Sequence, residues 1–169
     1  MSETVLFDNP ALESALIRMT TAIAASEIYL VGIHKGGAKV ANAIQEQLEQ
    51  AGNTVHRGNL DISFYRDDLD TIGPNPEVRP SNLPFDVCGK EIWLIDDVLY
   101  TGRTIRAAMD ELFDYGRPAS IKLAVLVDRG GRELPIRADC VGLAHAAPAD
   151  CTVKLITDGT WHIEQRQVK

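Results

Sequence analysis

The chain has 169 residues, and 45% of them are hydrophobic. This is enough apolar material for the core of one compact domain and too little for two, so we expect a single domain over residues 1–169. No stretch approaches the roughly 20 apolar residues of a membrane span, and the first residues lack the pattern of a secretory signal, which predicts a cytoplasmic protein without a membrane partner. A net charge of −7 argues against a protein that mainly coats nucleic acid. Cys88, Cys140 and Cys151 form no CxxC pair, which favours buried free thiols over a disulfide framework or a zinc site.

Helical and strand patterns alternate along the first half of the chain. Apolar residues recur at helical spacing over 12–23 and 40–48, and they form short continuous runs over 28–33 and 55–64. The next stretch, 65–84, is rich in acidic residues and prolines and has no sustained period. We expect it to be a long, flexible loop of functional importance, and we call it the hood loop.

The second half repeats the alternation. We expect a buried strand over 91–97, a helix over 105–113 and another buried strand over 121–127, while 138–169 is expected to add small edge strands. Strands that read as unbroken Ile, Leu and Val runs between helices are typical of a parallel sheet with helices on both faces. The predicted fold class is therefore α/β.

Two adjacent carboxylates, Asp96 and Asp97, stand at the end of the strand expected over 91–97. In a parallel α/β sheet, ligands bind beyond the carboxyl ends of the strands. Adjacent carboxylates repel each other and are costly to bury without partners, so we expect a ligand at this point. The cis-diol hydroxyls of a ribose can donate hydrogen bonds to such a pair, and a nearby Mg²⁺ would help to neutralise it.

A turn from Tyr100 to Thr104 follows the acidic pair and leads into the next expected helix. Its backbone N–H groups and those of the helix N-terminus suit a phosphate, Thr101 and Thr104 add hydroxyls, and Gly102 lets the backbone approach closely. Each feature alone is usually explained by a strand end or a helix cap. Together they predict diol and phosphate sites one short loop apart, the spacing of a ribose 5-phosphate.

The strand, the acidic pair and the Thr-Gly-Arg-Thr turn resemble the phosphoribosyl pyrophosphate signature of type I phosphoribosyltransferases. The loop His34-Lys35-Gly36-Gly37 also follows a strand and opens a helix, and it resembles the pyrophosphate loop of that family, although a glycine pair with a lysine is common by itself. Its pattern matches neither the dinucleotide motif nor the P-loop. The resemblance implies a catalytic role for the acidic pair, which would hold the ribose hydroxyls. It also implies that phosphoribosyl pyrophosphate, the sugar-phosphate donor of the reaction, is bound by Asp96, Asp97, Val98, Leu99, Tyr100, Thr101, Gly102, Arg103 and Thr104. Its pyrophosphate group would lie at His34, Lys35 and Gly36.

Four segments, 61–69, 97–104, 123–130 and 132–139, are similar to the PyrR family, the pyrimidine operon regulators with uracil phosphoribosyltransferase activity. The similarity implies a type I phosphoribosyltransferase fold, a homodimer or larger homo-oligomer, and transfer of the sugar phosphate to uracil to give UMP. Mg²⁺ would be bound through the donor and water, without a direct protein ligand. At the position that matches the family, Arg66 in the hood loop is expected to move into contact with phosphoribosyl pyrophosphate and act in catalysis. Val127, Asp128 and Arg129 are expected to bind uracil, with a surface ion pair as the alternative for Arg66 and Arg129.

Members of this family that bind a leader transcript use a basic surface formed by the first helix and the segment after residue 130. Arg18, Arg132 and Arg137 are the candidates for RNA contacts in this chain, and Gly131 stands where those members carry histidine. Phosphate contacts can persist where base-reading contacts are lost. The alternative function is therefore an RNA-binding transcription attenuator, with a leader mRNA as partner, that uses the nucleotide site mainly as a sensor.

A phosphoacceptor receiver domain also has paired aspartates after a strand. In that fold the pair follows the first strand and a lysine follows the last, whereas Asp96 and Asp97 follow a middle strand. We therefore discount this class.

Overall fold

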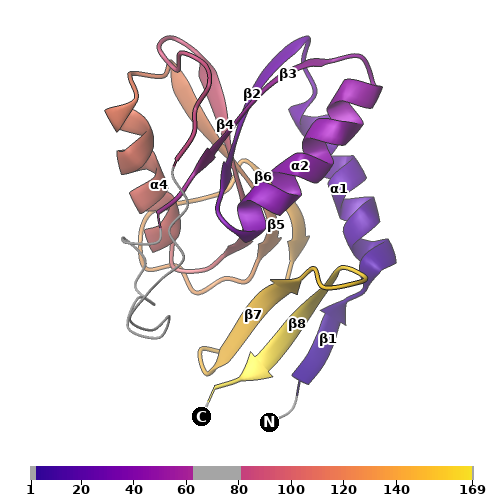
Figure 1. Cartoon of the computed structure of the whole chain (residues 1–169). Coiled ribbons are helices and arrows are strands. Elements are labelled where there is room, and N and C mark those ends of the chain that lie inside the picture. Colours follow the sequence, from indigo (N-terminus) through magenta and orange to yellow (C-terminus); the bar gives the residue numbers. More distant parts are fainter. Residues whose placement is uncertain (1–2, 63–80, 169) are drawn as a thin grey trace.

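The computed structural model describes residues 3–62 and 81–168, so most of the hood loop lies outside the described residues. Figure 1 shows a large sheet flanked by helices and a smaller sheet at one end of it. The strands are β1 (Glu3–Phe7), β2 (Glu27–Ile33), β3 (Thr54–Leu60), β4 (Glu91–Leu99), β5 (Ser120–Asp128), β6 (Cys140–Ala144), β7 (Cys151–Ile156) and β8 (His162–Gln167). The helices described are α1 (Asn9–Ile23), α2 (Gly36–Gln50) and α4 (Arg103–Asp114).

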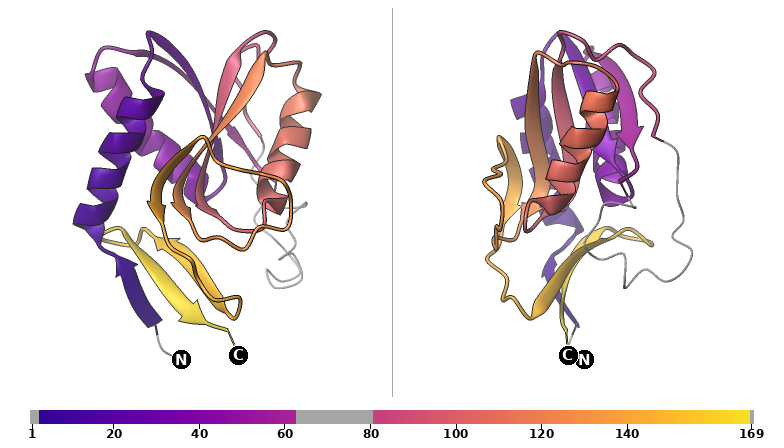
Figure 2. Two further views of the ribbon diagram at one scale, coloured as in Figure 1. Left: turned by 180° about the vertical axis from the view of Figure 1, so that it is seen from behind. Right: turned by 90° about the vertical axis from the view of Figure 1, so that its left-hand side faces the viewer.

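The larger sheet has the strand order β3-β2-β4-β5-β6, and all neighbouring strands in it are parallel. α1 and α2 pack on one face and α4 packs on the other (Figure 2). The predicted α/β class, with a parallel sheet and helices on both faces, is confirmed. The apolar runs over 28–33, 91–97 and 121–127 form the three central strands. Because helices cover both faces of these strands, their sequences do not alternate between apolar and polar residues.

The helices form where the sequence offers a cap and an apolar stripe. Asp8 caps α1 by accepting a hydrogen bond from the Ala11 N–H at 3.1 Å, and Pro10 fits the first turn, where its missing N–H costs nothing. Burial of each large apolar side chain on such a stripe contributes roughly 1.5–3 kcal/mol. The buried stripe of α1 comprises Leu12, Ala15, Leu16, Met19 and Ile23. In the described part of the chain, no helix combines the length and apolar character needed to cross a membrane.

β1, β8 and β7 form a separate antiparallel sheet in that order, which we call the small sheet (Figure 1). The expectation that 138–169 adds edge strands is right for β6, at the edge of the larger sheet, and for β7, at the edge of the small sheet, but not for β8. β7 and β8 leave the larger sheet, and β1 was not expected, because its partner β8 lies at the other end of the chain. Val153 and Ile163 join the apolar core beneath α1 and α2, and this contact anchors the small sheet.

Two finer expectations are wrong. β3 ends at Leu60 and not at residue 64. Cys88 is exposed, although buried thiols were expected, while Cys140 is half-buried and Cys151 is buried. Burial raises the pKa of the Cys140 and Cys151 thiols above the ordinary value.

The strand order contains a topological switch point. From β2 the chain crosses through α2 to β3 on one side, whereas from β4 it crosses through α4 to β5 on the other side, so β2 and β4 are neighbours whose connections diverge. In open α/β sheets, ligands bind beyond the carboxyl ends of the strands at such a switch point, and we call this region the crevice. The loops at these ends are 34–35 and 100–102, and both belong to the segments singled out from the sequence.

Candidate active site

Two carboxylates stand at the carboxyl end of β4. Asp96 is only 5% exposed, and its Oδ1 accepts a hydrogen bond from the Asp97 N–H at 2.9 Å. Asp97 is partly exposed, and its Oδ1 accepts a hydrogen bond from the Val98 N–H at 2.8 Å. The backbone amide that follows each carboxylate thus fixes its orientation. Both side chains can accept further hydrogen bonds from ligand hydroxyls, because each carboxylate offers about four lone-pair sites.

The loop after β2 lies directly against this pair. A Cβ atom on Gly36 would come within 2.0 Å of Asp97 Oδ2, and one on Gly37 would come within 2.4 Å of the Ile95 carbonyl oxygen. Real side chains do not tolerate such distances, so only glycine allows this close approach. The predicted pyrophosphate loop and the predicted acidic pair therefore meet in the crevice.

The same loop opens α2, whose N-terminus begins at Gly36. The His34 N–H donates to the Leu60 carbonyl at 2.9 Å, and the peptide bond between His34 and Lys35 is cis. Lys35 is the N-cap residue of α2, and its side chain makes no capping hydrogen bond. The first N–H groups of α2 and the Lys35 ammonium place positive charge at this point, which suits an anion.

The turn after β4 is built around a glycine. Gly102 has φ of 94°, in the left-handed region that favours glycine, and the Thr101 hydroxyl accepts a hydrogen bond from the Arg103 N–H at 3.2 Å. The Arg106 N–H donates to the Gly102 carbonyl at 2.9 Å and starts α4. Because the N-cap residue is glycine, it has no side chain that could cover the amides of the first turn.

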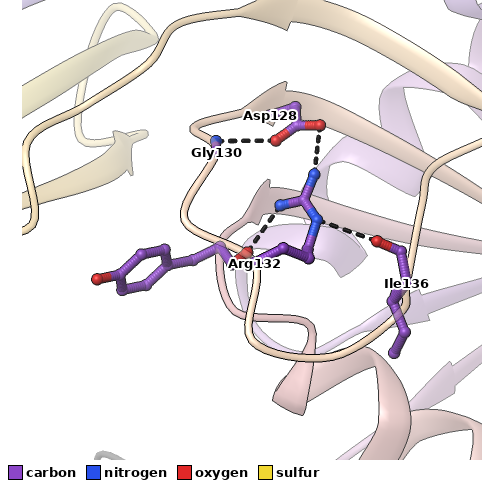
Figure 3. A network of polar contacts seen from close by, with 5 residues as sticks. Asp128, Gly130, Arg132 and Ile136 are labelled. Carbon is purple, nitrogen blue, oxygen red and sulfur yellow. Dashed lines mark hydrogen bonds and ion pairs between the residues drawn. The ribbon is translucent and has the colours of Figure 1, made fainter.

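β5 ends beside this turn. Its last two residues, Val127 and Asp128, are in register with the last two residues of β4, so the expected base-binding segment adjoins the phosphate turn. Val127 is fully buried. The Asp128 carboxylate accepts hydrogen bonds from the Gly130 N–H at 2.9 Å and from the Arg132 guanidinium at 2.6 Å (Figure 3).

Arg129, the third residue expected at uracil, directs its side chain to the segment that leads into β7. It is 3% exposed, and its guanidinium donates to the carbonyls of Pro148 at 2.9 Å and Cys151 at 2.6 Å. It also stacks on the Tyr100 ring, 3.8 Å from the ring centroid. The alternative of a surface ion pair is therefore wrong for Arg129. No sequence pattern signalled these contacts, because backbone carbonyls carry no residue signature.

The remaining candidates lie in different settings. Arg18 and Arg137 are both exposed, and Arg18 donates to the Gly142 carbonyl at 2.8 Å. Arg132 is bonded to three acceptors within the chain. Arg66 lies outside the described residues.

Arg57 on β3 is a charged residue near the crevice that the sequence did not single out. It is half-buried, and its guanidinium donates to the Ala38 carbonyl at 3.0 Å and to Asn42 Oδ1 at 3.1 Å, both in α2. Burial lowers the pKa of Arg57 to about 10, so it stays protonated at neutral pH. Its charge therefore adds to the positive potential behind the first turn of α2. The sequence gives no signal for this role, because an arginine on an edge strand is ordinarily expected to be exposed to solvent.

The family model of the phosphoribosyl transferase domain matches residues 3–154. A "Bifunctional protein PyrR" of Pseudomonas aeruginosa (strain LESB58) is 52% identical over 136 residues, covering 80% of this chain and 78% of that protein. The protein of the same name from Thermus thermophilus is 52% identical over 143 residues, covering 81% and 79%.

Solved structures share the fold at lower identity. A hypoxanthine phosphoribosyltransferase of Trypanosoma cruzi has a TM-score of 0.72 at 20% identity and covers 98% of this chain and 97% of its own. A hypoxanthine-guanine phosphoribosyltransferase of Bacillus anthracis has a TM-score of 0.67 at 18% identity, covering 90% and 87%. Taken with the family model and the relatives at 52% identity, these matches show that the chain belongs to the phosphoribosyl transferase domain family and, within it, to the PyrR family.

Proposed function

We propose that this chain is a Mg²⁺-dependent uracil phosphoribosyltransferase, which converts uracil and phosphoribosyl pyrophosphate to UMP and pyrophosphate. The observation that carries the proposal is the close approach of Gly36 to Asp97. It sets a loop that suits a pyrophosphate against carboxylates that suit a ribose diol. The turn 100–104 lies one short loop further on and suits the 5-phosphate. We therefore expect the ribose, the pyrophosphate and the 5-phosphate of phosphoribosyl pyrophosphate to bind at neighbouring points of one crevice.

In the proposed reaction, the bond between ribose C1 and the pyrophosphate oxygen breaks while a bond from C1 to the uracil nitrogen forms, and that nitrogen gives up its proton to water or to the leaving pyrophosphate. The sugar develops positive charge as this happens. Asp96 and Asp97 hold the ribose hydroxyls, and their negative charge stabilises the charge on the sugar. The amides of the turn 100–104 hold the 5-phosphate, so the sugar is fixed at two ends. Positioning and electrostatics therefore carry most of the rate enhancement.

The carboxylate oxygens at the crevice fit a Mg²⁺ ion that is bound through the substrate and water. Mg²⁺ prefers oxygen ligands and retains several waters. Among residues 3–62 and 81–168, no group of three or more His, Cys, Asp or Glu side chains could hold a metal by itself. Asp96 and Asp97 supply carboxylate oxygens at the point where ribose and pyrophosphate would meet. When bound, the ion neutralises the charge of the leaving pyrophosphate, and Lys35 with the first amides of α2 serves the same anion from the protein side.

The base is proposed to lie at the end of β5. The Asp128 and Arg129 carbonyls each accept one N–H of the chain, from His145 at 2.9 Å and Ala147 at 3.1 Å, and each keeps a second lone pair. These carbonyls can accept from an N–H edge such as that of uracil. The choice of uracil over a purine is supported by the PyrR relatives at 52% identity, because the purine enzymes share only the fold. A catalytic contact from Arg66 in the hood loop remains part of the proposal.

Pyrophosphate release from phosphoribosyl pyrophosphate and uracil, with and without Mg²⁺, tests the proposal. We expect turnover only when both substrates and Mg²⁺ are present, and Asp97→Asn should remove most of it. Asp110→Asn is the matched control, since Asp110 is an exposed carboxylate on α4 that pairs with Arg106 outside the crevice. Absence of turnover with every pyrimidine and purine base would refute the proposal.

A second activity is regulation of pyrimidine operon transcription through UMP-dependent binding of a leader transcript. It is proposed because relatives at 52% identity carry the name bifunctional protein PyrR. Of the candidate arginines, Arg18 and Arg137 are exposed, and Arg18 and Arg132 donate to acceptors within the chain. Binding of a pyrimidine-operon leader should therefore weaken with rising salt, tighten with UMP and fall in Arg137→Ala, while Arg117→Ala serves as an exposed control. Binding that ignores UMP, or equal losses in both variants, would contradict this activity.

A further inference from the structure

The loop after β5, residues 129–134, is hydrogen-bonded along the phosphate turn. Three successive carbonyls, those of Leu99 at the end of β4 and of Tyr100 and Thr101 in the turn, accept hydrogen bonds from it. The bond to Leu99 continues the pairing of β4 with β5, whereas the bonds to Tyr100 and Thr101 lie beyond the strands, and one of their donors is a side chain. The donors are the Arg129 N–H at 3.1 Å, the Arg132 guanidinium at 2.7 Å, and the N–H groups of Glu133 at 3.0 Å and Leu134 at 3.1 Å.

These bonds bear on anion binding by the turn. A turn binds phosphate through its N–H groups, and a carbonyl oxygen that faces the same point repels the anion. The three carbonyls are each held by a donor of the loop 129–134 and are therefore directed toward that loop. If they were released, the peptides of the turn could rotate and present oxygen to the phosphate.

The Tyr100 side chain is also held by this loop. On one side the Arg129 guanidinium lies 3.8 Å from the ring centroid, a stacked cation–π contact. On another side the backbone of Gly131 approaches so closely that a Cβ atom there would lie 2.5 Å from Tyr100 Cε2. The ring therefore keeps this position only because residue 131 has no side chain.

The two arginines tie the turn to other parts of the fold. Arg132 also donates to Asp128 Oδ2 at 2.6 Å and to the Ile136 carbonyl at 3.0 Å (Figure 3). Arg129 donates to the Pro148 and Cys151 carbonyls, at the entry to the small sheet. Displacement of the turn would therefore break contacts at the end of β5 and at the small sheet together.

We propose that Arg129, Gly131 and Arg132 form a clamp that positions Tyr100 and the phosphate turn, and so sets the affinity for the phosphate end of the donor. The proposal rests on the proposed function as far as the ligand is concerned. Arg129 and Arg132 act here as positioning residues, through the turn and without touching the substrate by their side chains.

Two neighbouring glycines provide the test and its matched control. Both have positive φ, 70° at Gly130 and 77° at Gly131, so alanine is similarly strained at either position. At Gly130 a Cβ atom meets nothing within 4 Å, whereas at Gly131 it meets the Tyr100 ring. Calorimetric titration with phosphoribosyl pyrophosphate and Mg²⁺ should show affinity at least about tenfold weaker in Gly131→Ala, comparable to the loss of one hydrogen bond, and near wild type in Gly130→Ala. Equal affinities in the two variants would overturn the clamp.

Hydrogen exchange tests the clamp without any substrate. The amides of 101–105 should exchange faster in Gly131→Ala than in Gly130→Ala, because the turn opens more often once the ring is displaced. Should the wild-type chain bind no phosphoribosyl pyrophosphate, the proposed function fails, and the exchange comparison still decides the clamp. Equal exchange in the two variants contradicts it.

Substitutions of the ring separate positioning from general stability. Tyr100→Leu should raise the KM for phosphoribosyl pyrophosphate about tenfold while lowering kcat far less, as expected when binding is lost uniformly. Tyr100→Phe keeps the ring and should recover most of that loss. Tyr115→Leu is the control, since Tyr115 is a comparably exposed tyrosine at the end of α4, 43% against 38% for Tyr100. A Tyr100→Phe variant as impaired as Tyr100→Leu would show that the ring is not the held element.

Discussion

Gly36→Ala should damage the crevice with little effect on the fold. The added Cβ would lie 2.0 Å from Oδ2 and 2.4 Å from Cγ of Asp97, whereas carbon atoms in optimal contact are about 3.5–4.0 Å apart. The loop and the carboxylate must therefore separate by about 1.5 Å. Asp97 cannot move that far and keep the 2.8 Å hydrogen bond from the Val98 N–H. The backbone of Gly36 has no positive φ, so alanine itself is not strained there.

A displacement of about 1 Å at a reacting centre can lower the rate about 10²-fold, which corresponds to about 2.7 kcal/mol of transition-state stabilisation. We therefore expect kcat/KM for phosphoribosyl pyrophosphate, with uracil saturating, to fall about 10²-fold in Gly36→Ala. The assay is initial-rate pyrophosphate release in the presence of Mg²⁺. Thermal unfolding of the same preparation should show a nearly unchanged midpoint.

Gly52→Ala is the matched control for Gly36→Ala. Gly52 has φ of 89° in the turn between α2 and β3, and a Cβ atom there meets nothing within 4 Å. Alanine should lower stability by about 1–2 kcal/mol through the left-handed backbone and leave turnover unchanged. If Gly36→Ala keeps kcat/KM within about threefold of wild type, the placement of Asp97 against the pyrophosphate loop is not needed for turnover, and the reasoning fails.

Three further outcomes are expected. Asp97→Asn keeps the size of the side chain and removes its charge, so kcat in the pyrophosphate assay should fall by at least about 10²-fold with the fold intact by circular dichroism, whereas a fall below threefold would contradict a role at the sugar. A backbone carbonyl and the Glu164 carboxylate hold the pKa of His162 above its ordinary value, so its contribution to stability is present below about pH 6.5 and is lost as the pH rises through the raised pKa. His162→Gln should therefore shift the urea midpoint more at about pH 5.5 than at about pH 9, and an equal shift at both would argue against it. Iodoacetamide at about pH 8 should modify exposed Cys88 and spare Cys151, whose burial raises its pKa, and equal labelling by mass spectrometry would disprove that order.

The central part of the fold could be predicted because its signals are local. The apolar stripe of α1, the unbroken runs of β2, β4 and β5, and the glycines at the ends of helices each follow from a short stretch of sequence. The small sheet could not be predicted in this way, because it joins the first and last strands of the chain, whose pairing depends on the position of everything between them. Five residues such as those of β1 carry too little periodicity to identify a strand.

The candidate site shows the same division. Asp96, Asp97 and the turn 100–104 were recognised from their order along the chain, and the structure adds the approach of Gly36 that no spacing rule contains. Arg129 was expected at the base as part of a motif, whereas its guanidinium binds carbonyls near β7. Backbone acceptors have no sequence signature, so contacts of this kind become visible only in three dimensions.

Base competition tests whether the chain transfers the sugar phosphate to uracil. Equimolar uracil, hypoxanthine and guanine are incubated with phosphoribosyl pyrophosphate, Mg²⁺ and the full chain, and the nucleotide products are separated by chromatography. We expect UMP to be the dominant product and no nucleotide to form without Mg²⁺. Purine nucleotides as the main products, or no nucleotide from any of the three bases, would contradict it.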